Sequence, residues 1–144
     1  MSTLRTNALE GMDAKNSITI VAGAGNITTT NVQEGLAKVW INMNCTGTIA
    51  TRESFNVSGI TDNATGNQTV SFSNIMTNNT YCTSQGINDD PGAYGSLNTV
   101  EQSNGSNYGD FITTSSFKFR SVQNRSDAYV DVGTIQISML GDLA

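Results

Sequence analysis

The chain has 144 residues, a formal net charge of −5 and 13% charged residues, where an average globular domain has roughly 25%. It contains no histidine, which excludes Ser-His-Asp catalysis and zinc sites built on imidazole. Seven lysines and arginines are too few for a nucleic-acid surface, and no apolar run approaches the roughly 20 residues of a membrane-spanning helix. We therefore expect no nucleic-acid partner and no membrane insertion. Asn, Thr, Ser and Gly make up 65 of the residues, which favours short strands joined by turns.

Residues 1–35 are predicted to form an N-terminal anchoring arm. Within it, Ser17–Val21 has the composition of a short strand. Residues 31–38 have helical character with Asn31 as the N-cap, although Gly35 limits any helix to about one turn. The first ten residues lack the apolar stretch of a secretory signal, so we expect the chain to fold in the compartment where it is made.

Residues 36–144 are predicted to form a β-sandwich body, because apolar residues recur there at every second position in short segments. The clearest segment is Lys38–Asn44, which places Val39, Ile41 and Met43 on one face and Trp40 on the other. Further strands are predicted at 81–84, 116–120 and 134–140.

A β-hairpin is predicted in the middle of the chain. Phe55 and Val57 alternate, Ile60 follows, and the same period resumes over Gln68–Phe72. Between them, residues 62–67 are rich in turn formers. We interpret these two segments as a hairpin with a longer loop.

Residues 85–110 are predicted to be a loop-dominated excursion that carries the surface for recognition. Tyr94 and Tyr108 lie there beside Asn104 and Asn107, and aromatic rings next to adaptable amides suit carbohydrate or protein surfaces. Anchoring of the loop against the sandwich is the alternative role for the two tyrosines.

The strand pattern changes register near the C-terminus. Val130 and Val132 share one parity, while Ile135 and Ile137 share the other, with Gly133 between them. A β-bulge at the glycine would keep both halves facing one core. The alternative is a bend where the strand moves from one sheet to another.

The two cysteines, Cys45 and Cys82, could form one disulfide. We expect instead that both are reduced and buried as small hydrophobic side chains. The expected fold is all-β: an antiparallel β-sandwich, jelly-roll-like, of roughly seven to nine strands with an extended N-terminal arm.

No catalytic constellation stands out. Glycoside hydrolysis needs two carboxylates, but we interpret the available acidic residues as solvated surface side chains. These residues are Glu101, Asp110, Asp127 and Asp131. The glycine-rich residues 23–28 lack the third glycine and the following helix of a dinucleotide site. We expect a protein that is not an enzyme and that holds no cofactor and no metal.

Two segments, residues 38–49 and 52–63, resemble small fibre-like virion proteins of tailed bacteriophages, especially aquatic and cyanobacterial phages. The shared pattern is K-x-W-x-N-x-N, a Gly-Thr linker, and then R-x-S-F-N-V-S-x-I-T-D-N. The likeness covers roughly residues 36–84, and the opening residues 1–9 look like the start of such proteins.

The resemblance implies a tail-fibre-like or capsid-attached appendage of the virion. Such a protein assembles in the host cytoplasm as a homotrimer, attaches to capsid, portal or tail proteins through its N-terminal part, and contacts glycan on the host surface. Anchoring residues are then expected near Leu4, Arg5 and Leu9. Two alternatives stay open: a capsid decoration or cement protein with no receptor role, and a soluble carbohydrate-binding module.

Overall fold

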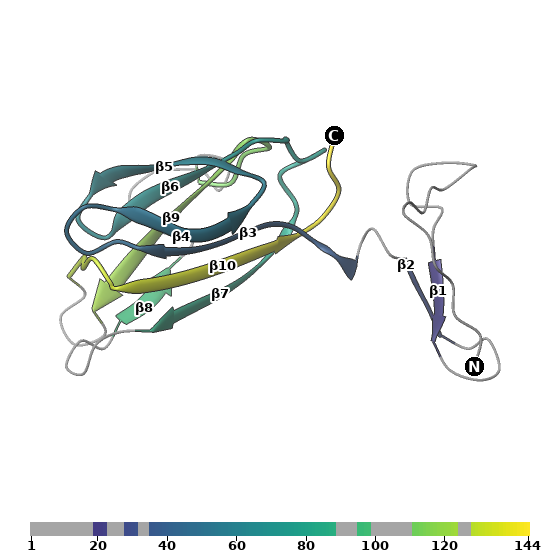
Figure 1. The fold of residues 1–144 in the computed structure, drawn as a ribbon, viewed down its shortest axis with the longest axis horizontal. Coiled ribbons are helices and arrows are strands. Elements are labelled where there is room, and N and C mark those ends of the chain that lie inside the picture. Colours follow the sequence, from purple (N-terminus) through teal and green to yellow (C-terminus); the bar gives the residue numbers. More distant parts are fainter. Residues whose placement is uncertain (1–18, 23–27, 32–34, 89–94, 99–110, 124–127) are drawn as a thin grey trace. The chain divides into compact units, whose positions relative to one another are not determined.

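The structure is a computed structural model that describes residues 19–22, 28–31, 35–88, 95–98, 111–123 and 128–144 (Figure 1). The chain divides into two units, Met1–Leu36 and Ala37–Ala144. In the first unit, strand β1 (Thr19–Ala22) pairs antiparallel with β2 (Thr28–Asn31).

The helical character predicted over residues 31–38 is present at Gly35, which is in helix. Strands flank it closely, since Asn31 ends β2 and Ala37 begins β3. The three consecutive threonines before Asn31 are β-branched and favour the extended backbone of β2.

The second unit is an antiparallel β-sandwich, which confirms the predicted fold class. Its described residues contain eight strands in two four-stranded sheets, as jelly rolls also have. The first sheet has the order β4-β3-β10-β7, with β4 Ala50–Phe55, β3 Ala37–Asn44, β10 Thr134–Leu140 and β7 Cys82–Asn88. The second has the order β5-β6-β9-β8, with β5 Val57–Ala64, β6 Asn67–Phe72, β9 Ser116–Gln123 and β8 Gly95–Asn98.

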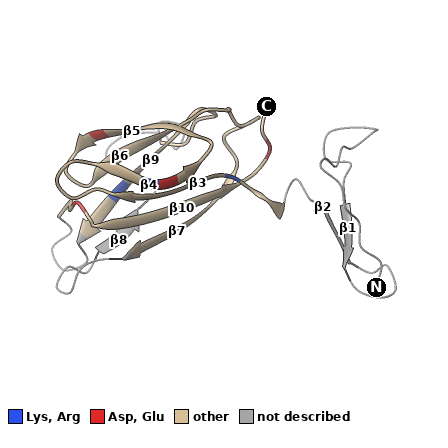
Figure 2. Cartoon of the chain, viewed as in Figure 1, with Lys and Arg blue, Asp and Glu red and all other residues tan. Residues whose placement is uncertain are grey.

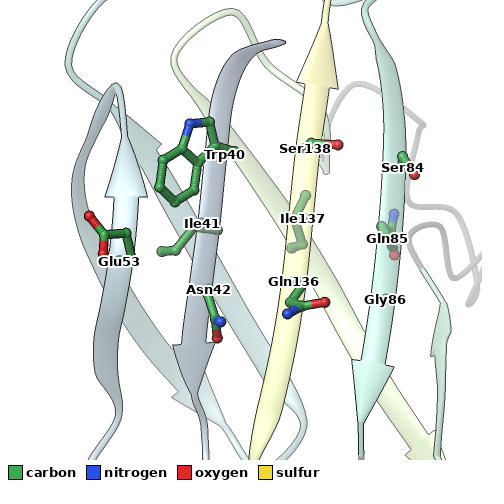
Figure 3. A pocket seen from close by; sticks show the side chains of 10 residues that line it. All are labelled: Trp40, Ile41, Asn42, Glu53, Ser84, Gln85, Gly86, Gln136, Ile137 and Ser138. Carbon is green, nitrogen blue, oxygen red and sulfur yellow. The ribbon is translucent and has the colours of Figure 1, made fainter.

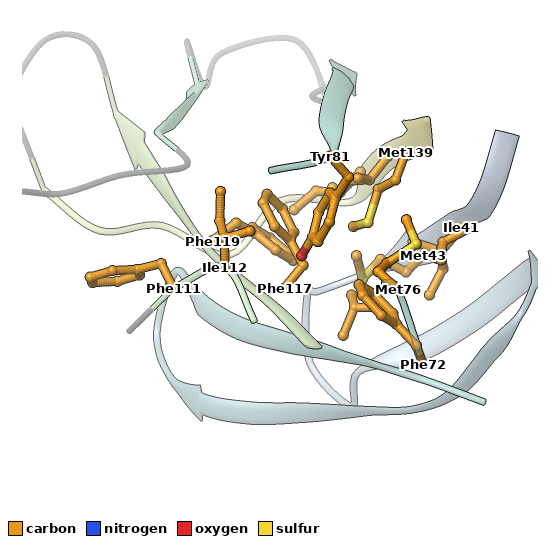
Figure 4. Packing of buried hydrophobic residues seen from close by; sticks show 14 of the residues in the cluster. Ile41, Met43, Phe72, Met76, Tyr81, Phe111, Ile112, Phe117, Phe119 and Met139 are labelled. Atoms are coloured by element: carbon orange, nitrogen blue, oxygen red, sulfur yellow. The ribbon is translucent and has the colours of Figure 1, made fainter. Parts of the chain in front are cut away.

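The core lies between the inner faces of the two sheets (Figure 4). From the first sheet, Ile41 pairs with Ile137 and Met43 with Ile135, and all four side chains are buried. From the second sheet, Phe117 and Phe119 are fully buried, and Val70 and Phe72 face the same interior. The parity predicted for Lys38–Asn44 is therefore confirmed, with Trp40 directed away from the core.

The chain passes from the first sheet to the second at Asn56, so Phe55 and Val57 do not share a strand as predicted. Asn56 has a positive φ of 57°, which asparagine tolerates better than other residues with a side chain. Its amide donates to the carbonyls of Lys38 and Asn74, both at 3.0 Å, and its Oδ1 accepts from the Asn74 N–H at 2.7 Å. These bonds hold the corner and end β4 at Phe55.

The hairpin of β5 and β6 is present, but its connection is shorter than predicted. The strands run to Ala64 and from Asn67, so only Thr65 and Gly66 form the turn. Gly66 has φ +62°, and its N–H donates to Asp131 Oδ1 at 2.7 Å. Most of the polar residues that suggested a loop belong instead to the exposed end of the edge strand β5.

The expectation of one long excursion over residues 85–110 is also wrong in part. Strand β7 continues to Asn88, because it pairs with the whole of β10 from Leu140 back to Thr134. Residues 95–98 add strand β8 to the edge of the second sheet. Partners in distant parts of the chain make these residues extended, which local composition does not reveal.

Of the two interpretations offered for Gly133, the structure has the bend between sheets and not the bulge. Before the glycine, the Val130 N–H donates to Ser121 O in the second sheet, and Val132 O already accepts from the N–H of Cys45, which follows β3 of the first sheet. After it, β10 pairs within the first sheet. The Arg52 guanidinium holds this crossing, with Nη2 2.6 Å from Gly133 O and Nη1 3.0 Å from Thr134 Oγ1.

The two cysteines are free, as predicted, but only one is buried. Cys45 follows β3 and is 2% exposed, and burial raises the pKa of its thiol from 9.0 to about 12, with the carboxylates of Asp131 and Asp62 acting in the same direction. Cys82 is exposed, contrary to the prediction. Its neighbour Tyr81 points inward, so the period of two in the edge strand turns Cys82 outward.

Candidate ligand-binding groove

A groove of about 630 Å³ lies on the outer face of the first sheet, on the side opposite the core (Figure 3). All four strands of that sheet contribute to it. The residues that line it are Trp40, Ile41, Asn42, Glu53, Ser84, Gln85, Gly86, Gln136, Ile137 and Ser138.

The side chains on this face form two rows that run across the strands. One row contains Trp40, Ser138 and Ser84, which are register partners on β3, β10 and β7. Because neighbouring strands lie about 4.8 Å apart, this row on three strands extends over about 10 Å, and a row on all four strands extends over about 14 Å. The groove is therefore long in the direction perpendicular to the strands.

The second row contains Glu53, Asn42, Gln136 and Gly86, again in register from β4 to β7. It supplies a carboxylate and two amides, with Asn42 on β3 and Gln136 on β10 side by side (Figure 3). An amide both donates and accepts hydrogen bonds, whereas an ionised carboxylate only accepts. The row thus offers uncharged donors and acceptors along most of its length.

Small residues keep the groove open over β7. A Cβ atom added at Gly86 would lie 3.5 Å from Gln136 Oε1, which is ordinary van der Waals contact. The backbone does not require glycine here, because no positive φ is present. A side chain at this position would occupy the groove without straining the sheet.

Trp40 gives the groove its only indole, and Phe55 lies beside it as its partner on β4. Phe55 is 52% exposed, so the two aromatic residues present apolar surface next to the polar rows. An aromatic ring binds the apolar face of a flat ligand, while its neighbours hydrogen-bond the ligand's polar edge. The arrangement suits a ligand with one apolar face and many hydroxyl or amide groups.

Charged residues are sparse throughout the body (Figure 2). Glu53 is the single charged side chain among those that line the groove. Arg52, next to it in sequence, donates to Asn42 Oδ1 at 3.4 Å and to Met43 O at 3.2 Å, besides its bonds at the crossing near Gly133. Its guanidinium therefore helps to position the Asn42 amide within the row.

Several predicted site residues fall outside the described residues. These are the surface-recognition residues Tyr94, Asn104, Asn107 and Tyr108 and the anchoring residues Leu4, Arg5 and Leu9. Of the four carboxylates considered for hydrolysis, only Asp131 is described. It accepts from Gly66 N and from Gln68 Nε2 at 3.1 Å, and so it has a structural role at the hairpin turn.

The groove residues were not predicted as a site from the sequence. The available signal was Trp40, a lone tryptophan on the polar face of a strand. The register that brings Gln136 and Ser84 beside it depends on β10, nearly a hundred residues away, and on β7, more than forty residues away. Short-range patterns contain no information about that pairing.

Comparisons of the chain with protein-family models, with curated proteins and with solved structures return no match. Within the described ranges, no three His, Cys, Asp or Glu side chains are grouped in a way that could hold a metal ion. No helix in the described part of the chain is long and apolar enough to cross a membrane.

Proposed function

We propose that this chain is a non-enzymatic attachment protein whose body binds carbohydrate on a cell surface through the groove of the first sheet. The observation that carries the proposal is Trp40, which lies at the end of a row of hydroxyl side chains and beside a row of amides on one open face. A sugar ring has an apolar face and a rim of hydroxyl groups, so it complements an aromatic side chain surrounded by uncharged hydrogen-bonding groups.

The shape of the groove supports a chain-like ligand. All four strands of the first sheet line it, and it opens on the outer face of that sheet. A small metabolite is usually enclosed in a pocket that covers most of its surface, whereas a polymer must be able to leave the site at both ends. A polysaccharide meets that requirement.

The setting that we propose is a bacteriophage particle, on the sequence resemblance of residues 36–84 to fibre-like virion proteins. The N-terminal unit would attach the protein to capsid, portal or tail, and the body would face outward. Assembly as a homotrimer would place three weak carbohydrate sites on one appendage, and linked weak sites bind a repetitive surface far more tightly than one site does.

The binding site is tested by replacing Trp40. In titrations of the purified full chain against a glycan panel, Trp40→Ala should weaken binding by about fivefold to twelvefold, because stacking on an aromatic ring contributes roughly 1–1.5 kcal/mol. The matched control is the double variant Tyr94→Ala/Tyr108→Ala, which tests whether the tyrosines predicted from the sequence bind the glycan instead. Loss of binding in the double variant with full binding in Trp40→Ala would move the site away from the groove.

The particle setting is tested separately. We expect a trimer by native mass at micromolar concentration and density for the protein on the surface of purified particles by cryo-EM. A monomer under these conditions would contradict the trimer. Particles that carry the protein but whose isolated protein binds no glycan would identify a decoration protein instead.

A further inference from the structure

We propose that the groove selects neutral glycan chains over acidic ones, and that Glu53 is the specificity-determining residue. This inference rests on the proposed carbohydrate-binding function and adds the chemical class of the ligand.

The charge composition of the groove is the first argument. Among the lining residues, amides, hydroxyls and apolar groups surround one carboxylate, that of Glu53. Glu53 is exposed on β4 and is the register partner of Asn42, so its negative charge lies at one end of the amide row. An acidic sugar bound along that row would bring its own carboxylate toward a like charge, which disfavours binding.

The positions of the cations are the second argument. Four lysines and arginines lie in the described part of the body: Lys38, Arg52, Lys118 and Arg120. Lys38 is 6% exposed, and Lys118 and Arg120 belong to β9 of the other sheet, where both stack over the Phe111 ring.

Arg52 is the cation nearest to the groove, but its guanidinium is already committed. It donates to four uncharged acceptors, on Asn42, Met43, Gly133 and Thr134, at 2.6–3.4 Å. Recognition of an acidic sugar by arginine needs a guanidinium fork that faces the ligand. Here the fork is used to hold the crossing between the sheets and to orient Asn42.

The geometry also sets how the chain lies. Trp40 and Glu53 are at the β3–β4 end, while Gly86 leaves the β7 end open. A glycan that crosses the strands stacks one ring on Trp40 and places the hydroxyl groups of the following rings against Asn42 and Gln136. Such a ligand passes close to Glu53 whichever way it runs.

The experiment compares a linear oligosaccharide of neutral hexoses with its counterpart of hexuronic acids, titrated into the full chain at low ionic strength. We expect the wild-type protein to bind the neutral chain about twofold to fivefold more tightly, because an exposed pair of charges contributes up to roughly a factor of five. Glu53→Gln should reduce this ratio by roughly twofold to fivefold, and Glu53→Lys should reduce it further. Raising the salt concentration should reduce the ratio for the wild-type protein, since it screens exposed charges.

Two variants make the result specific to the groove. Asp62→Asn removes an exposed carboxylate from β5 in the other sheet and should leave the ratio unchanged. Gly86→Leu should abolish binding of both oligosaccharides, because its side chain fills the groove at an unstrained position.

The outcomes separate the two proposals. Equal binding of neutral and acidic chains, with no change of ratio in Glu53→Gln, overturns the selectivity while Gly86→Leu still places carbohydrate in the groove. Preference for the acidic chain overturns it as well. If neither oligosaccharide nor any glycan of the panel binds, the carbohydrate function itself is wrong.

Discussion

The two faces of the first sheet are built from the same strands and yet differ in almost every property. On β3, Ile41 and Met43 point into the core and are at most 2% exposed, whereas Trp40 and Asn42 alternate with them and line the groove. The inner face must match the volume of the opposite sheet, so its residues are apolar and closely packed. Among the described residues, no second sheet packs against the outer face, so its side chains can carry binding chemistry.

From this contrast we expect that substitutions can change the stability of the fold and the proposed ligand binding separately. A substitution on the inner face removes packing contacts, whereas one on the outer face mainly changes what a ligand meets. The following predictions test whether the separation holds.

The largest change in the free energy of unfolding is expected for a substitution on the inner face of the first sheet. Ile41→Ala should lower the free energy of unfolding by about 2–5 kcal/mol, because it removes a buried side chain and leaves a cavity between Ile137 and the opposite sheet. Urea unfolding followed by tryptophan fluorescence measures it, with Trp40 as the single reporter. A loss below about 1 kcal/mol would show that the inner face is not closely packed.

The buried thiol predicts a loss of stability at alkaline pH. The pKa of Cys45 is raised to about 12 in the folded state, so its thiol stabilises the fold fully below pH 9 and this contribution is lost as the pH rises toward 12. The slope should approach about 1.4 kcal/mol per pH unit in this window.

The control for that slope is Cys45→Ala, which should unfold with a shallower dependence between pH 9 and 12. Identical slopes in the two proteins would mean that the thiol is not held in its neutral form by burial. The exposed Cys82 should react with a thiol reagent in the folded protein, while Cys45 should react only after unfolding.

Gly66 and Gly47 have nearly equal positive φ angles, but only Gly66 is closely surrounded by other atoms. Alanine at the two positions therefore separates the cost of close packing from the cost of the backbone conformation. Gly66→Ala should cost more than about 2 kcal/mol, because the left-handed backbone disfavours a Cβ and the new atom would lie 2.6 Å from Ser121 O and 2.7 Å from Val130 N. Gly47→Ala, at φ +66° with no atom within 4 Å of its Cβ, should cost only about 1 kcal/mol. Thermal unfolding of both variants measures the difference, and equal costs would argue against close packing at Gly66.

The smallest effect on stability is expected on the outer face. Trp40→Ala should lower the free energy of unfolding by about 1 kcal/mol or less, since it removes a half-buried side chain next to its register partner Phe55 on the outer face and leaves the core cluster intact. The same variant should weaken glycan binding by about fivefold to twelvefold. A loss of stability as large as that of Ile41→Ala would remove the distinction between the faces, and calorimetry on both variants decides it.

The alternation of apolar and polar residues correctly predicted those strands that have one face in the core and stay within one sheet. The alternation in β3 and the pair Phe117 and Phe119 in β9 identified strand and buried face together. The alternation did not predict where the chain passes from one sheet to the other. Asn56 ends a strand through a left-handed conformation and side-chain bonds to Lys38 and Asn74, partners that are distant in sequence.

The candidate site was the least predictable feature. Adaptable amides and aromatic residues were expected to act together, and they were assigned to the excursion around Tyr94 and Tyr108. In the described part of the chain such groups meet instead on a sheet, where Trp40, Gln136 and Ser84 come together by strand pairing.

Composition alone determined that the protein is an all-β chain with a polar, weakly charged surface and without histidine chemistry, because those properties depend only on which residues are present. The period of two then determined which side chains enter the core. Only the tertiary structure decided that the chain changes sheets at Asn56 and Gly133 and that two rows of polar residues meet on one outer face. The reason is that sheet order and register depend on contacts between strands far apart in sequence, such as β3 with β10, and short-range periodicity contains no term for them.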